Sequence, residues 1–124
     1  MRSLFTILAV FIFIIGCNQP QLKGVDYYKT GTFKTVLKDK KSTFSIAERN
    51  DSIQVETYEG KKDTFLIKWK SNFEYILLKK NPKNALDSTP FHVKITKFDG
   101  DSYQFKAFYK GSNFKQEGTA TKTH

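Results

Sequence analysis

The sequence predicts an all-β domain, an antiparallel up-and-down meander of about eight strands that coils into a small or half-open lipocalin-like barrel. Three observations predict it. From Thr30 onward apolar and polar residues alternate with period two, and no repeat at helical spacing is long enough to indicate a helix. Clusters of Gly, Asn, Asp and Ser separate these runs. Most connections are too short for a parallel crossover, so strands must pair with their sequence neighbours.

The first half of the domain contains four expected strands. Phe44 and Ile46 are expected to share one face of the second strand, and Ile53 and Val55 to oppose Gln54 in the third. Asn, Asp, Gly and Lys residues supply the turns between them. These strands are placed at residues 30–37, 43–48, 53–58 and 64–70.

The second half begins with a strand at 73–78, which has apolar residues on both faces and is therefore expected to be central or covered. Residues 79–90 form the one long connection, with room for one helical turn, and are the natural place for a lid. A strand from Phe91, a turn at Asp99-Gly100, and strands at 103–109 and 114–121 complete the chain.

Closure distinguishes two possible architectures. A long meander coils under its own twist, and joining its ends removes exposed edges, which favours a barrel. A two-sheet β-sandwich is the alternative. It would usually require a Greek-key crossing, for which only the connection at 79–90 is long enough.

The N-terminus has the layout of an export signal. Arg2 is followed by an uncharged apolar run from Leu4 to Ile15. As a helix this run would reach about 18 Å, whereas a bilayer core needs about 30 Å, so it is not expected to span a membrane. We assign residues 1–16 to a signal peptide, 17–28 to a lipidated N-terminus with a flexible tether, and 29–124 to one β-barrel-like domain.

The end of the apolar run, Ile14-Ile15-Gly16-Cys17, resembles the lipobox of bacterial lipoproteins. The resemblance implies cleavage between Gly16 and Cys17 and lipid attachment at the Cys17 thiol. Two or three acyl chains would hold the protein firmly on a membrane. The expected location is the cell envelope, at the outer membrane facing the periplasm. An ordinary signal peptide with a chance cysteine is the alternative.

Composition limits the remaining choices. Removing the signal, residues 1–16, leaves 108 residues, enough for one domain. The only cysteine is Cys17, so the domain has no internal disulfide. The formal charge of +9 comes mostly from lysine and suits an anionic envelope surface. Because the lysines spread along the whole chain, we favour the simpler interpretation that they solubilise outward faces.

A further set of residues runs through most of the mature domain: Thr30-Gly31, Phe33, Arg49, Asp51-Ser52, Gln54, Glu56-Thr57, Trp69, Glu74-Tyr75, Asn81-Pro82-Lys83-Asn84 and Gly118-Thr119. In these residues the chain resembles small lipoproteins of unknown function from Flavobacteriia and other Bacteroidota. Some of those proteins are labelled DNA topoisomerase IV. This chain does not support that label, because it is short, begins with an expected export signal and lacks a nucleotide loop. The resemblance implies the compartment and the fold of the chain, and it implies no activity.

Candidate chemistry is sparse. Asp99-Gly100-Asp101 lacks the ligand spacing of a calcium loop and is expected to be a hairpin turn. His92 and His124 have no partner at metal-ligand spacing. Aromatic residues interleaved with lysines, as at Phe105-Lys106, imitate a nucleic-acid platform, but strand alternation produces the same pattern. We therefore expect no metal, no cofactor, no nucleic acid and no catalysis.

Two serines resemble the O-glycosylation acceptors of Bacteroidota. These are Ser52 in Asp51-Ser52-Ile53 and Ser88 in Asp87-Ser88-Thr89. Asp-Ser pairs are also common in turns.

The sequence leaves two functions open. The first is a binding module whose barrel accepts a small apolar or amphipathic envelope molecule, with Arg49 as the orienting charge and residues 79–90 as a cover. The second is a structural or interaction lipoprotein with a filled core that contacts anionic lipid, polysaccharide or a protein. A continuous cavity with convergent polar groups would favour the first. The aromatic residues expected to line it are Trp69, Tyr75, Tyr103 and Phe105.

Overall fold

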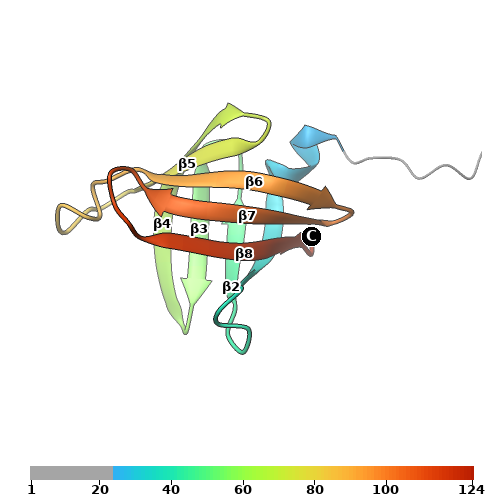
Figure 1. The fold of residues 1–124 in the computed structure, drawn as a ribbon, viewed down its shortest axis with the longest axis horizontal. Coiled ribbons are helices and arrows are strands. Elements are labelled where there is room, and N and C mark those ends of the chain that lie inside the picture. Colours follow the sequence, from blue (N-terminus) through green and yellow to red (C-terminus); the bar gives the residue numbers. More distant parts are fainter. Residues whose placement is uncertain (1–23) are drawn as a thin grey trace, which may run out of the picture.

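A computed structural model of the chain describes residues 24–124 (Figure 1). The predicted signal peptide, the Gly16-Cys17 cleavage and lipid site, and the first part of the predicted tether lie outside these residues. Among the residues described, no helix is long and apolar enough to cross a membrane.

The fold is an all-β closed barrel of eight antiparallel strands in sequence order, which confirms the predicted meander. A short 3₁₀ helix precedes the barrel. The elements are η1 (Val25–Tyr28), β1 (Gly31–Leu37), β2 (Ser45–Arg49), β3 (Ile53–Tyr58), β4 (Lys61–Ser71), β5 (Glu74–Lys79), β6 (Phe91–Asp99), β7 (Ser102–Tyr109) and β8 (Lys115–Lys122).

Pairing of the first and last strands closes the sheet. Strand β1 pairs with β2 on one side and with β8 on the other, with Phe33 opposite Lys122 and Leu37 opposite Gly118. In Figure 1, strands β6 to β8 run across the front of the barrel and β2 to β4 run down behind them. One continuous sheet without a free edge therefore forms in place of the alternative sandwich.

Gly118 permits close packing where β8 meets β1. A Cβ atom there would lie 2.7 Å from the Val36 carbonyl oxygen and 2.8 Å from Cζ of Phe105. The absent side chain leaves room for the Phe105 ring inside the barrel.

The two barrel ends differ because η1 covers one of them. Tyr28 of η1 is 2% exposed, and its hydroxyl donates a hydrogen bond of 2.5 Å to the carbonyl of Gly100 in the β6–β7 turn. Its ring packs on Phe98 at 4.7 Å and Tyr103 at 5.8 Å between centroids. The folded domain thus begins before residue 29, where the sequence placed its start, because the last part of the predicted tether is the cover of this closed end.

Strands β2 and β3 turn polar residues toward the barrel interior. The face with Phe44 and Ile46, the apolar face expected for the second strand, is therefore not the inward one. Ser45, Ala47 and Arg49 are buried, whereas Phe44 is 52% exposed. In β3 the alternation is as predicted, but Gln54 is on the buried face. The physical reason is that this part of the interior surrounds a buried guanidinium and needs hydrogen-bonding side chains.

The other strands turn apolar residues inward. Their inward residues form an apolar core in which Tyr103 and Phe33 are fully buried. Between β5 and β6, the backbone N–H of Ser88 donates to the Asn84 carbonyl at 3.3 Å, so the long connection contains a single turn. The other core members are Ile67, Tyr75, Leu77, Val93, Ile95, Phe105, Ala107 and Ala120.

Candidate functional site

A cavity of about 320 Å³ lies inside the barrel and opens at the end opposite η1. One wall, from β2, β3 and the start of β4, is polar, and the opposite wall, from β5 to β7, is apolar. Residues of the β1–β2 connection and Tyr58 surround the mouth. The polar wall consists of Ser45, Arg49, Gln54, Glu56 and Asp63, and the apolar wall of Leu77, Phe91, Val93 and Phe105.

Arg49 forms the floor of the cavity, where β2 ends beside η1. The residue is 6% exposed. Nε donates to Oε1 of Gln54 at 2.9 Å, and Nη1 donates to the carbonyl of Tyr28 at 2.8 Å. Nη2 donates to the hydroxyls of Tyr103 at 3.0 Å and Tyr75 at 3.3 Å. The guanidinium therefore ties η1 to strands β3, β5 and β7.

All of these acceptors are neutral. No carboxylate in residues 24–124 lies within the 4.0 Å that defines an ion pair with Arg49. The rings of Phe33 and Tyr75 lie 4.4 and 4.9 Å from the guanidinium carbon and supply cation–π contacts. A guanidinium has five N–H groups, so four hydrogen bonds leave one donor on Nη1 for a further acceptor.

Tyr75 of β5 and Tyr103 of β7 accept hydrogen bonds from the guanidinium across the barrel interior. Their hydroxyls lie 2.8 Å apart. Burial, followed by the proximity of Tyr103, raises the pKa of Tyr75 well above its ordinary value. Its phenol is therefore neutral at physiological pH and does not supply the anion that Arg49 lacks.

Glu56 is a second charged group on the polar wall, half-buried and facing the cavity. Burial raises its pKa, and the neighbouring charge of Asp63 adds to that effect. A hydrogen bond with Ser45 and the positive charge of Arg49 lower the pKa in part, but the net direction is upward. Within the described part of the chain, Glu56 has no cationic partner at ion-pair distance.

The structure brings together three of the five residues expected to bind a ligand. Arg49, Tyr75 and Phe105 line the cavity. Tyr103 lies behind them and contacts Arg49, so it positions the floor. Trp69 does not line the cavity. Its ring packs on Tyr75 at 4.8 Å, and its buried Nε1 has no hydrogen-bond partner among residues 24–124.

Sequence reasoning missed the polar wall. Ser45, Gln54 and Glu56 were not expected to line a cavity, because polar residues on an alternating strand are expected to face solvent. The usable signal was the regular spacing of Gln54 and Glu56 within the strand, which places both on one face whichever way that face points.

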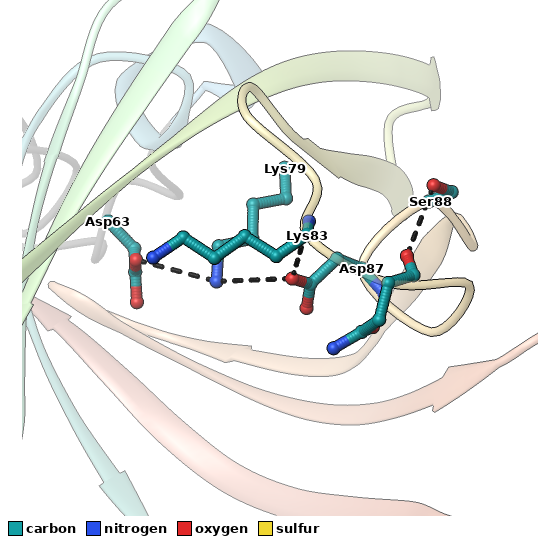
Figure 2. A network of polar contacts seen from close by, with 6 residues as sticks. Asp63, Lys79, Lys83, Asp87 and Ser88 are labelled. Atoms are coloured by element: carbon teal, nitrogen blue, oxygen red, sulfur yellow. Dashed lines mark hydrogen bonds and ion pairs between the residues drawn. The ribbon is translucent and has the colours of Figure 1, made fainter.

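The connection at 79–90, expected to cover the cavity, supplies none of its lining among the residues described. Figure 2 shows what holds it beside the barrel. Lys79 Nζ lies 3.6 Å from Asp63 and 3.7 Å from Asp87, and the backbone N–H of Lys83 donates to Asp87 at 3.1 Å (Figure 2). These contacts fasten the connection to the start of β4, beside the mouth.

The remaining predicted residues point away from the barrel interior, although neighbouring side chains leave His92 only 8% exposed. Ser52 and Ser88 are exposed in turns, and their glycosylation stays a prediction. His92 is on the outer face of β6, stacked on Phe108, with Nδ1 3.3 Å from Glu74. No group of three potential metal ligands (His, Cys, Asp or Glu) occurs within residues 24–124.

No family model, curated protein or solved structure matches the chain. The function must therefore be argued from the cavity and its residues.

Replacing Arg49 by Met should lower the free energy of unfolding by about 3 kcal/mol, because buried carbonyl and side-chain acceptors lose their donor. Urea unfolding measures this change. Arg49→Lys should also destabilise the protein, since an ammonium group cannot donate hydrogen bonds to all four acceptors in the geometry of the planar guanidinium. Lys68→Met, on the exposed outer face of β4, is the matched control. An Arg49→Met protein as stable as that control would contradict the proposed role.

Replacing Glu56 by Gln should stabilise the protein increasingly as pH rises from about 4 to 7. A carboxyl whose pKa is raised on folding contributes stability below its unfolded pKa, and that contribution is lost as pH rises through the folded pKa. The amide cannot lose a proton, so it avoids this loss. Urea unfolding across the pH range measures the difference, with Glu48→Gln on the outer face as the control for lost charge. A difference that does not grow with pH would argue against the buried position of Glu56.

Proposed function

We propose that this chain is a membrane-anchored envelope lipoprotein and a non-catalytic binding module for a small amphipathic molecule held inside the barrel. The anchor at Cys17 and the location at the outer membrane, facing the periplasm, rest on the sequence alone. The binding role rests on the barrel interior.

The cavity is the observation that carries the proposal. Its volume of about 320 Å³ is within the usual range for small-molecule pockets, about 300 to 1,000 Å³. One polar and one apolar wall suit a ligand with a polar end and an apolar body. The aromatic residues leave this space open, which argues against the alternative of a structural protein with a solid core.

Arg49 determines the orientation that we propose for the bound ligand. A buried cation without an ion-pair partner is poorly compensated, and an anionic group beside it would supply the missing charge at low dielectric. The unused donor on Nη1 would add a charge-assisted hydrogen bond. We therefore place an anionic group at the floor and the apolar body along Leu77, Phe91 and Phe105.

Glu56 and Asp63 limit the charge of that group. Both carboxyls belong to the same polar wall, so a ligand with two negative charges would meet repulsion from them. A single carboxylate with an adjacent hydrogen-bond donor, such as a hydroxyl, would satisfy Arg49 and Glu56 together. The proposed ligand class is thus a monoanionic amphiphile.

A head-group series tests this proposal. Decanoate, decanol and decyltrimethylammonium share a chain and differ in charge, and each can be titrated into the protein by calorimetry. We expect decanoate to bind at least about tenfold more tightly than decanol, because a hydrogen bond to a charged donor is added. The cationic amphiphile should bind most weakly.

A cavity-filling variant tests whether the ligand binds inside the barrel. Ala47→Met places a flexible side chain in the cavity and should weaken binding of decanoate. Ala85→Met makes the same change in the exposed β5–β6 connection and should leave binding unchanged. Equal affinity for the three head groups would contradict the proposed placement of an anionic group beside Arg49. Equal binding of decanoate by the two variants would contradict binding inside the cavity.

A further inference from the structure

The open end of the barrel has a surface unlike the rest of the molecule. Four connections and the strand ends beside them meet there, and we call them the open rim: residues 38–44, 58–62, 80–90 and 110–115. In Figure 1 they lie along the lower and left sides of the barrel, away from η1 and the C-terminus. The cavity mouth opens among them, between Phe44 and Tyr58.

Each of the four rim connections exposes a large apolar side chain. Phe44 is 52% exposed, Leu86 55% and Phe114 46%, and Tyr58 is 39% exposed at the end of β3. Only two other large apolar residues in the described chain are comparably exposed. Single exposed apolar side chains are ordinary, but here every connection at one end of the barrel carries one, as is common on surfaces used for binding.

The same rim is strongly basic. It contains half of the eighteen lysines in residues 24–124, all exposed, against three acidic residues, Asp39, Glu59 and Asp87. At the closed end, the connections carry Asp26, Asp51 and Asp101 and a single lysine, Lys29. Lysines that appear scattered along the sequence are therefore concentrated in space. The rim lysines are Lys38, Lys40, Lys41, Lys61, Lys62, Lys80, Lys83, Lys110 and Lys115.

Neighbouring side chains contact two of the apolar rim residues, Phe44 and Phe114. Lys34 Nζ lies 4.6 Å from the ring centroid of Phe44, and the ring of Phe114 packs on Tyr109 at 5.8 Å. Both rings nevertheless keep about half of their surface in solvent. Rings held in this way lose little conformational freedom when a partner covers them.

We propose that the open rim docks on an anionic bilayer surface, with the rim lysines at the lipid phosphates and Phe44, Leu86 and Phe114 in the headgroup region. Each lysine near such a surface contributes about 1 kcal/mol, and apolar side chains add burial at the interface. Charge complementarity selects this partner over a neutral surface. The docked rim would place the cavity mouth against the lipid, so an amphiphile could enter without crossing water.

Vesicle binding tests the proposal. The chain from Asn18 onward lacks the predicted lipid site but retains every strand of the barrel. It should cosediment with phosphatidylcholine vesicles that contain phosphatidylglycerol and bind phosphatidylcholine alone far more weakly. Replacing Lys41 and Lys110 by Gln should reduce affinity about 25-fold, about fivefold for each charge.

Matched controls separate docking by the rim from attraction by net charge. Lys68→Gln with Lys97→Gln removes two exposed charges from the barrel wall and should change affinity little. Phe114→Ser should weaken binding, whereas Phe73→Ser, at an exposed ring of the closed end, should not.

Three results would overturn the proposal. Equal losses from the two lysine pairs would show attraction by overall charge alone. Equal effects of the two phenylalanine changes would show that Phe114 makes no specific apolar contact with the bilayer. Binding to a soluble polyanion such as heparin, without binding to phosphatidylglycerol vesicles, would assign the rim to a different partner. Because no ligand is added, failure here is distinguishable from failure of the cavity proposal.

Discussion

The organisation of the barrel interior depends on the hydrogen bonds that the buried Arg49 guanidinium donates. This group joins the carbonyl of Tyr28 to Gln54, Tyr75 and Tyr103, and so holds the cover of the closed end to three strands. A buried cation requires hydrogen-bond acceptors, and Gln54 of β3 turns inward beside Arg49 of β2 to supply one of them. Ser45 and Glu56 lie on the same inward faces. The resulting polar wall faces the apolar wall of β5 to β7, and the space between them is the cavity.

The strand order could be predicted from sequence because its determinants are local. Period-two runs and turn residues placed every strand to within a few residues, and short connections required neighbouring strands to pair. The inward face of β2 could not be predicted in the same way. Alternation shows that Phe44 and Ser45 point to opposite sides, but choosing the inner side assumes an apolar interior, and Arg49 makes this part of the interior polar.

The site was predictable only in part, because it depends on register across the sheet. Arg49 could be singled out as the one arginine of the domain, and the aromatics as inward residues of regular strands. Gln54 and Glu56 gain their roles from lying beside Arg49 after β2 and β3 pair. Similarly, Lys41 and Lys110 are far apart in sequence, and only the up-and-down topology gathers them at one end.

Native mass spectrometry of the protein, purified gently from its native cells, tests most directly whether the cavity is a ligand site. The account predicts a non-covalent mass increment, released on denaturation as a small monoanionic amphiphile and absent from the Ala47→Met protein. Wild-type protein with no such increment, or an increment retained equally by Ala47→Met, would contradict it.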